Sequence, residues 1–333
     1  MKRNGKHTVT ILLVAVLALL VSMQPLAAQQ QRIVIRFGTQ NPVGHPVDVG
    51  ARRAAEIIDR MSGGRIQLQI FPGDQLGSQP EQMANTIRGS QDMYLSTAAW
   101  LGPYFGPVGV LDANYLFTGA DHLFRVMKGP VGQELFRHLP SAVGVRIVDV
   151  WYFGARHFTS NKLFRTPAEL GRLKTRVANA PIFIENARCM GANPTPMGIG
   201  EVYLALKTGV VDAQENPLTN ILNFKFFEVS KYLILTAHQI GSFIPSINER
   251  AWQSLGPEGQ KILLTAFEEG GKVNNALVYK AESELVAQFK TAGMEVITPD
   301  PEPFRQMARK CLPEKFGNVW GQGLYEAIQS SGR

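Results

Sequence analysis

Strand and helix patterns alternate along the first third of the chain, and this alternation constrains the fold more than any other feature of the sequence. Residues 32–37 alternate apolar with polar side chains, as in a half-buried strand. Apolar residues from Val47 to Met61 then recur at helical spacing. A strand, a helix and a short strand are expected next, at 66–71, 81–88 and 93–96. This order is that of βαβ units and predicts an α/β fold with a parallel sheet core.

The alternation resumes after a stretch rich in glycine and proline at 101–110. Further elements are expected as strands at 145–151, 158–160 and 173–178, helices at 182–190 and 201–207, and a short strand that begins at 210–213. From 257 to 292 the sequence is helical over an unusual length, with a break indicated mainly at Gly270-Gly271. A helix of this length could brace two domains, and a chain of 333 residues is long enough to form two.

The N-terminus has the layout of a secretory signal peptide. Lys2, Arg3 and Lys6 precede an apolar run from Val9 to Val21, and small residues follow up to Ala28. The alternative is a membrane anchor, but the run is shorter than the ~20 residues that span a bilayer. We therefore expect cleavage after Ala28 and a soluble periplasmic protein, since no later segment is apolar enough to span a membrane.

Composition excludes several classes of protein. Hydrophobic residues make up 45% and charged residues 18%, which is typical of a globular protein and not of a disordered one. The formal charge is +7, and it falls to +4 without residues 1–28, which carry three basic side chains and no acidic ones. Because the basic excess forms no stripe, no nucleic-acid partner is predicted. The excess is compatible with an anionic ligand.

The two cysteines, Cys189 and Cys311, lie far apart in the sequence. An oxidising compartment would permit a bridge between them, but the sequence does not show whether they come within reach. No CxxC pair is present, so zinc or redox chemistry has no support. We expect both to be packing residues.

Motifs for catalysis and for cofactors are absent. The chain contains no GxGxxG, GxxxxGK[ST], GxSxG or HExxH motif, and its six histidines are scattered without ligand spacing. We therefore predict no cofactor, no metal site and no enzymatic activity, although a hidden enzyme stays open as the minority interpretation.

Two arginines are the strongest candidates for a binding site. Arg156 lies between two short expected strands, and Arg176 lies within a strand that otherwise looks buried. A buried guanidinium is costly unless it is paired, and neither arginine has an acidic residue beside it in an obvious position. A ligand carboxylate would satisfy either one in bidentate fashion. A salt bridge to a distant Asp or Glu, or a surface position, remains an equal alternative for each.

A series of short motifs then places the chain in a known family. The motifs are Phe37-Gly38, Phe71-Pro72, Gln75-Leu76-Gly77, Thr159-Ser160-Asn161, Leu173 to Val177, Gly191-Ala192 with Pro194 and Pro196, Glu201-Val202-Tyr203, Val211-Asp212, and Gln214-Glu215-Asn216-Pro217. In this order, behind a signal peptide, they resemble the extracytoplasmic substrate-binding proteins of TRAP transporters, the family named for C4-dicarboxylate binding. The resemblance covers essentially the whole mature chain.

The resemblance implies roles for several residues. Arg176 matches the arginine that forms the central salt bridge to the ligand carboxylate, and Arg156 matches a second carboxylate contact. Asn216 matches the asparagine that hydrogen-bonds the same group, with Asn179 as a pocket neighbour. Gln40 lies in the loop where related proteins place a polar ligand contact.

His45, in the same loop, could contact a hydroxyl or a second acid group of the ligand, but helix capping or exposure to solvent is the favoured alternative. Trp100, Trp151 and Phe183 are either pocket walls or core residues.

The chain departs from the sialic-acid binders of this family at Ser78, Gln79, Thr97 and Ile199, where those proteins carry acidic residues or an aromatic one. A smaller monocarboxylate, a dicarboxylate or a sugar acid such as a uronate therefore fits better than sialic acid.

The resemblance also implies an architecture and partners. We expect a two-domain periplasmic-binding-protein-like α/β fold with an interdomain cleft and a long helix along both domains. The first domain should comprise 29–153 plus 242–281, and the second 154–241 plus 282–333. The protein should be a monomer that captures a small carboxylate and delivers it to the TRAP membrane permease subunits, whose ion gradient drives import.

Three other functions remain open. An ABC-type periplasmic binding protein would use the same cleft with a different permease. A secreted hydrolase could be built on the same two-domain shell, and a ligand sensor could feed a receptor kinase.

Overall fold

A computed structural model describes residues 32–331 of the chain. It contains one ten-stranded mixed sheet whose main order is β2-β1-β3-β9-β5-β8-β6-β7, with β4 and β10 paired to β9. The strands are β1 Ile33–Thr39, β2 Ile66–Phe71, β3 Met93–Ser96, β4 Val145–Ile147, β5 Trp151–Ser160, β6 Lys174–Val177, β7 Asn193–Pro196, β8 Ala213–Pro217, β9 Tyr232–Asn248 and β10 Glu295–Ile297.

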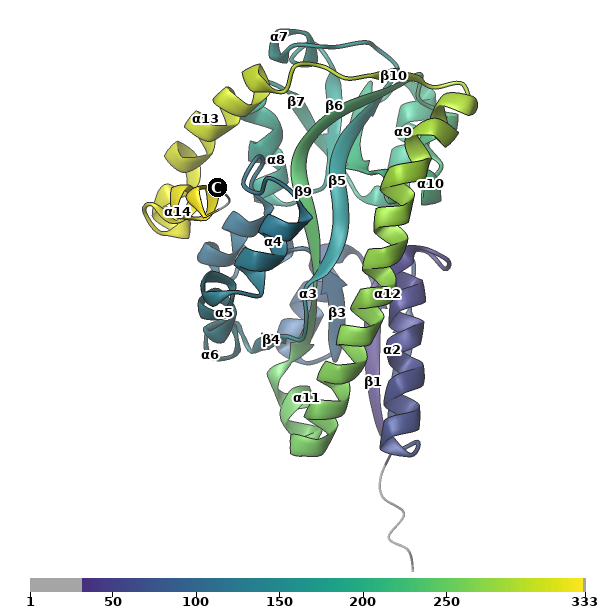
Figure 1. The fold of residues 1–333 in the computed structure, drawn as a ribbon, viewed down its shortest axis with the longest axis vertical. Coiled ribbons are helices and arrows are strands. Elements are labelled where there is room, and N and C mark those ends of the chain that lie inside the picture. The colour runs from purple at the N-terminus through teal and green to yellow at the C-terminus, as the bar shows by residue number, and fades with distance from the viewer. Residues whose placement is uncertain (1–31, 332–333) are drawn as a thin grey trace, which may run out of the picture.

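Helices pack on both ends of the sheet, and the molecule has two α/β halves (Figure 1). The half drawn lower in Figure 1 carries α2 Pro46–Ser62, α3 Gln79–Arg88, α4 Ala120–Met127, α5 Pro130–Arg137, α6 Leu139–Val143 and α11 Glu249–Ser254. The upper half carries α7 Pro167–Leu170, α8 Pro181–Arg188, α9 Val202–Thr208 and α10 Leu218–Asn223. The 3₁₀ turns are η1 Ala98–Trp100, η2 Gly106–Asp112, η3 Ile199–Glu201 and η4 Phe226–Glu228. The expected two-domain α/β architecture is therefore confirmed.

The sheet is mixed, and the expectation of a parallel core holds at its two ends and for the short β10, which pairs in parallel with β9. β1 pairs in parallel with β2 and β3, and β6 pairs in parallel with β7 and β8. Between them β9 runs antiparallel to β3 and to β5, and β5 runs antiparallel to β8. β5 and β9 are long enough to run through both halves of the molecule (Figure 1). The strand expected at 145–151 begins as β4 and ends at the first residue of β5. The strand expected at 158–160 is the other end of the same continuous β5.

The long helix is present as α12 Gly256–Thr291, which runs along one side of both halves (Figure 1). The break expected at Gly270-Gly271 is wrong, because these glycines serve close packing and not helix termination. A Cβ on Gly270 would lie 2.5 Å from the carbonyl oxygen of Gly50 on α2, and a Cβ on Gly271 would lie 2.6 Å from Nε1 of Trp151. The apolar core of the half that contains α2 forms around the contact between α2 and α12, and it also includes residues of β1, β2 and β3.

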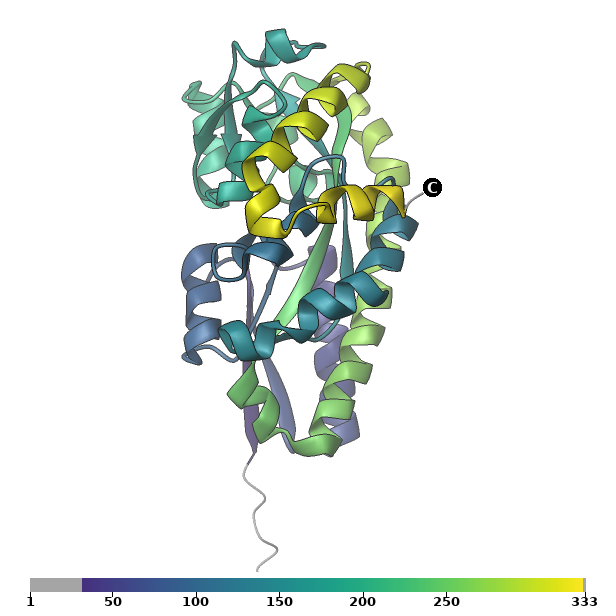
Figure 2. The same cartoon turned by 90° about the vertical axis from the view of Figure 1, so that its left-hand side faces the viewer.

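The C-terminal helices return to the middle of the molecule. α13 Glu302–Trp320 descends from the end of the upper half, and α14 Leu324–Ser330 lies beside α4 (Figure 2). The Tyr325 hydroxyl donates to the carbonyl of Asn114 at 3.0 Å, and Gln329 donates to the carbonyl of Tyr115 at 2.8 Å. The C-terminal segment, which the sequence assigns to the second domain, therefore also contacts a segment assigned to the first.

Cys189 and Cys311 form a disulfide between the end of α8 and α13, with their Cα atoms 5.5 Å apart. The expectation that both cysteines only pack is thus wrong, because the tertiary fold brings together two residues separated by 122 positions. The signal-peptide prediction for residues 1–28 lies outside the described residues. None of the helices within 32–331 is both long and apolar enough to cross a bilayer.

Two buried histidines support the backbone as hydrogen-bond acceptors. His45 is the N-cap of α2, and its Nδ1 accepts the N–H of Val47 at 3.2 Å. Nδ1 of His157 accepts the N–H of Ala237 at 3.1 Å, where the β5–β9 register shifts and Ala237 has a φ of 42°. Burial lowers the pKa of each imidazole to about 3. Each ring is therefore neutral in the folded protein at neutral pH.

We expect removal of the disulfide, by Cys189→Ser with Cys311→Ser, to lower the free energy of unfolding by about 2–4 kcal/mol, because the reduced unfolded chain gains conformational freedom. Chemical denaturation of the double variant and the parent measures the difference. Two free thiols in the exported native protein, found by mass spectrometry, would contradict the pairing.

We expect the free energy of unfolding to fall as the pH is lowered below 6.5, the usual pKa of histidine. The unfolded chain takes up a proton there, whereas His45 and His157 stay neutral until about pH 3. Each contributes up to about 1.4 kcal/mol per pH unit in that window. His45→Gln should reduce the slope measured by thermal denaturation, and His138→Gln, at an exposed position, is the control. An unchanged slope in His45→Gln would contradict this account.

Candidate functional site

A narrow cavity lies between strands β5, β6 and β8 on one side and the loops after β1 and β3 on the other. Its volume is about 20 Å³, which is room for a water molecule and not for an organic acid. The two sides must therefore separate before a ligand can enter. The lining residues are Gln40, Gln79, Thr97, Trp100, Phe153, Arg156, Arg176, Ala178, Phe183, Ile199 and Asn216.

The fold thus brings four of the sequence-predicted site residues together. Gln40 follows β1, whereas Arg156, Arg176 and Asn216 come from the neighbouring strands β5, β6 and β8. Two of the aromatic candidates, Trp100 and Phe183, are also walls of the cavity.

Arg176 is buried and has no acidic partner within ion-pair distance in the described part of the chain. Its side chain is 1% exposed, and its Nε and Nη2 donate to the carbonyl of Met197 at 3.1 and 2.8 Å. Burial lowers the pKa of Arg176 to about 10, so the group is still charged at neutral pH. Three of the five N–H groups of its guanidinium make no hydrogen bond within residues 32–331. This guanidinium is suited to receive an acid.

Arg156 has an internal acidic partner, so of the alternatives left open for it the salt bridge to a distant acid is the one that the structure shows. Its Nε and Nη2 donate to the two carboxylate oxygens of Glu215 at 2.5 and 2.8 Å, and Nη2 also reaches the Glu215 carbonyl at 3.0 Å. β5 and β8 pair with Arg156 opposite Pro217 and Phe158 opposite Glu215. Glu215 is therefore only two residues from Arg156 along the ladder, which a sequence cannot show without the pairing.

The Arg156–Glu215 pair is a fully buried ion pair. The two side chains are 4% and 6% exposed. Burial alone would raise the pKa of Glu215, but the Arg156 charge and His238 outweigh it and hold the pKa at about 2. Nε2 of His238 lies 3.3 Å from the Glu215 carboxylate, and the Phe183 ring centroid lies 5.1 Å from the Arg156 guanidinium carbon. Arg156 is thus fixed on several sides.

Asn216 is held by neighbouring amides. Its Oδ1 accepts from Nδ2 of Asn220 at 2.9 Å, and its own Nδ2 donates to Oε1 of Gln214 at 2.7 Å. Gln214 in turn donates to Thr159 at 3.0 Å. This fixes the amide orientation and leaves one N–H of Asn216 for a ligand oxygen.

His45 does not line the cavity. It caps α2, which was the favoured alternative, and its Nε2 lies 3.0 Å from Oδ1 of Asn220. Asn41 also donates to that oxygen, at 3.4 Å. A buried chain of polar groups therefore runs from the loop after β1 through Asn220 to Asn216.

Asn179 is also outside the cavity, because it is exposed in the bend after β6. Ala178, two residues after Arg176 and hence on the same side, takes the lining position that was expected for Asn179. Trp151 is a core residue, since its Nε1 donates to the carbonyl of Phe267 on α12 at 3.0 Å.

Sequence reasoning missed Glu215 as the partner of Arg156 and Asn220 as the support of Asn216. Glu215 stood within the Gln-Glu-Asn-Pro motif, but only its place in a strand buried along its whole length shows that it must be paired. Gln79, Thr97 and Ile199, three of the positions where the chain departs from sialic-acid binders, all line the cavity.

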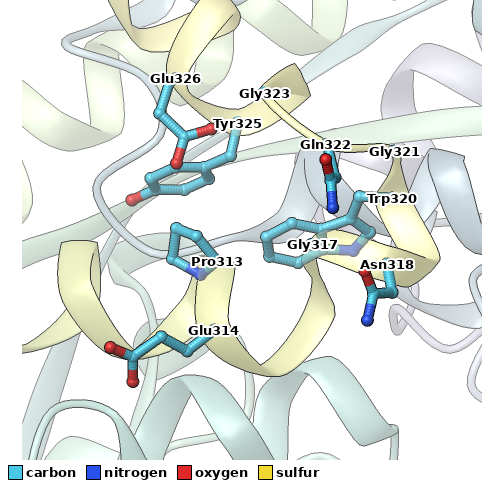
Figure 3. A pocket seen from close by; sticks show the side chains of 10 residues that line it. All are labelled: Pro313, Glu314, Gly317, Asn318, Trp320, Gly321, Gln322, Gly323, Tyr325 and Glu326. Carbon is cyan, nitrogen blue, oxygen red and sulfur yellow. The ribbon is translucent and has the colours of Figure 1, made fainter.

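A larger hollow of about 230 Å³ lies between α13 and α14 (Figure 3). Among the described residues that line it, the charged ones are Glu314 and Glu326, and none is a lysine or an arginine. This lining offers no cation to pair with an acid, whereas Arg176 lines the smaller cavity. Within residues 32–331 no three histidine, cysteine, aspartate or glutamate side chains gather into a metal site.

Comparison with known proteins finds similar periplasmic binding proteins over most of the chain. The sequence is 32% identical to the sialic acid-binding periplasmic protein SiaP of Vibrio cholerae, over 98% of this chain and 99% of that one. It is 31% identical to the 2,3-diketo-L-gulonate-binding periplasmic protein YiaO of Escherichia coli, over 89% and 87% of the two chains. A TRAP periplasmic solute-binding protein from Polaromonas sp. JS666, solved with D-erythronate, superposes with a TM-score of 0.84 at 28% identity and covers 90% of this chain and 99% of its own.

The resemblance to TRAP solute-binding proteins is thereby confirmed. These matches favour a TRAP solute-binding protein over an ABC-type binding protein or a hydrolase. The model of the family described as bacterial extracellular solute-binding protein, family 7, matches residues 37–317. Members of this family bind substrates for transport and are not enzymes. The chain belongs to family 7 of the bacterial extracellular solute-binding proteins.

Proposed function

We propose that this protein captures an organic acid through a salt bridge between the ligand carboxylate and Arg176. The observation that carries the proposal is a buried, charged guanidinium with three N–H groups free of protein partners within the described residues. A buried charge is costly unless it is paired, and a carboxylate matches the guanidinium geometry. Asn216 adds a hydrogen bond from the same side, since one of its N–H groups is available.

Gln40 supplies a contact from the opposite side of the cavity. Its side-chain oxygen is buried and has no hydrogen-bond partner in the described part of the chain. A buried amide oxygen is usually hydrogen-bonded, and a ligand hydroxyl would donate that hydrogen bond. The relatives are named for, or were solved with, sialic acid, 2,3-diketo-L-gulonate and D-erythronate. A hydroxylated acid smaller than sialic acid fits the neutral side chains of Gln79, Thr97 and Ile199.

Capture then requires the two domains to open and close. We place the first domain at 29–153 plus 242–281 and the second at 154–241 plus 282–333. These boundaries meet at Gly154 on β5, which pairs with Gly241 on β9 and has a φ of 105°. The neighbouring Glu282 of α12 accepts the N–H of Ala155 at 2.7 Å. Rotation about these points would separate Gln40 from Arg176 and admit the ligand.

The ligand-loaded form would dock on TRAP permease subunits. We propose that residues 1–28 direct the chain to the periplasm and are removed after Ala28, and that the mature protein acts as a monomer. The family is one of extracytoplasmic solute-binding proteins, which supports this location.

We expect Arg176→Ala to abolish ligand binding while the protein stays folded, because Arg176 forms no ion pair in the described structure. A thermal-shift screen of sugar acids, dicarboxylates, 2-oxoacids and aromatic acids identifies the ligand, and titration calorimetry then compares the variants. Loss of a buried charge pair costs roughly 3–5 kcal/mol, which corresponds to more than about 100-fold in Kd.

Arg172→Ala is the matched control, since Arg172 is an exposed arginine four residues away. It should bind as the parent does. Parent-like affinity in Arg176→Ala would refute the proposed salt bridge, and a parent protein that binds no acid in the screen would refute the proposed function.

A further inference from the structure

A row of buried polar side chains connects the loop after β1 with Asn216 at the cavity. Nε2 of His45 and Nδ2 of Asn41 lie 3.0 and 3.4 Å from Oδ1 of Asn220 on α10. Nδ2 of Asn220 donates to Oδ1 of Asn216 at 2.9 Å, and Asn216 donates to Gln214 at 2.7 Å. Each of these side chains is at most 2% exposed. We call His45, Asn220, Asn216 and Gln214 the polar relay.

The direction of the hydrogen bonds is fixed at the end of the relay that lies in the loop after β1. Nδ1 of His45 accepts the backbone N–H of Val47, and a backbone N–H can only donate. Because the ring is neutral, its one proton is on Nε2, which therefore donates to Asn220. Asn41 donates to the same oxygen, and its own Oδ1 faces the Thr39 hydroxyl at 3.2 Å. Two donors from this loop thus hold the carbonyl side of the Asn220 amide toward them.

The other end of the relay leaves the direction open. Gln214 donates to the hydroxyl oxygen of Thr159 at 3.0 Å, and a hydroxyl can either accept or donate. Nη2 of Arg156 lies 3.5 Å from Oδ1 of Asn216, which is longer than an ordinary hydrogen bond. That nitrogen already donates to the carbonyl and to the carboxylate of Glu215. The loop after β1 therefore decides which side of the Asn216 amide is the donor.

We propose that Asn220 is a positioning residue, which sets the amide of Asn216 so that an N–H faces the ligand carboxylate. A carboxylate only accepts hydrogen bonds, so a reversed amide would turn its oxygen toward an anion and weaken binding. This inference rests on the proposed function and deepens it, because it assigns control of that site's amide to a residue outside the cavity.

The relay also connects ligand binding with closure. On the domain boundaries proposed above, Asn41 and His45 belong to the first domain and Asn220 belongs to the second. The Asn216 donor is therefore set only while the two domains are in contact. A ligand that needs this donor binds the closed form more tightly than the open one, which is the condition for a ligand to shift the equilibrium.

Asn220→Ala tests the inference, because it removes the acceptor for His45 and the donor to Asn216. The probe is the acid that the parent binds most tightly among D-erythronate, D-glucuronate, succinate, pyruvate and benzoate. Titration calorimetry should find roughly tenfold weaker binding by Asn220→Ala. Asn223→Ala is the matched control, since Asn223 is on the same helix and its side chain donates to the carbonyl of Thr219 at 2.8 Å. The control should bind as the parent does.

A double-mutant cycle distinguishes positioning from a general loss of structure. If Asn220 acts through Asn216, Asn220→Ala should cost no further affinity once Asn216→Ala has removed the amide. Binding that is too weak for calorimetry is followed by the thermal shift at high probe concentration. A full additional loss of affinity in the double variant overturns the positioning role, because a structural defect would act in either background.

Binding rates test the connection with closure. Stopped-flow tryptophan fluorescence can follow the probe, since Trp100 is a wall of the cavity. We expect faster dissociation from Asn220→Ala and an association rate close to that of the parent, because the relay forms after the ligand has entered. A loss of affinity that comes entirely from slower association overturns the coupling to closure.

Asn220→Ser replaces Asn220→Ala in each experiment if the alanine variant does not fold, because the hydroxyl keeps a polar group beside His45. An acid that binds the parent and the Asn220 variant equally well overturns this inference and leaves the proposed function intact. A parent protein that binds no acid in the screen overturns the proposed function and this inference with it.

Discussion

The pairing of β5 with β9 is the constraint on which both the fold and the site depend. These two strands run through both halves, so every movement of one half against the other passes through them. β5 carries Arg156 and pairs on its other edge with β8, which brings Glu215 to the guanidinium. β9 carries His238 to the same carboxylate. Strand pairing thus builds the charged centre between the halves, and no local segment could do so alone.

Two arginines of similar burial have opposite roles because of a single neighbour. Arg156 faces Glu215, so its charge is compensated within the protein, and the pair lowers the pKa of the carboxyl despite the burial. Arg176 is on β6, two strands from β5 in the sheet order, and within residues 32–331 its guanidinium donates only to the carbonyl of Met197. Buried charges are stable when paired and costly when not. Arg176 therefore carries the proposed affinity for an acid, whereas Arg156, whose charge Glu215 compensates, shapes the cavity that it lines.

Much of the fold could be predicted because its local patterns agree with the tertiary structure. α2 and β2 lie within a residue or two of their expected bounds, since one face of each is buried. β9 was missed because a glycine and a proline interrupt its residues and hide the strand period. α13 was missed in the same way, through its internal Pro313. Arg176 was singled out correctly as a buried cation, but the Glu215 partner and the disulfide depend on contacts across long sequence separations.

The cavity size and the free guanidinium together suggest how a ligand would control closure. In the described conformation the walls leave about 20 Å³ beside Arg176, and burial already lowers the pKa of that side chain. The closed form therefore contains an unpaired, desolvated charge, which raises its free energy relative to an open form with the charge in water. A ligand shifts a conformational equilibrium only by its differential affinity for the two states. An acid that pairs Arg176 in the closed form supplies that difference, whereas a neutral analogue of the same shape does not.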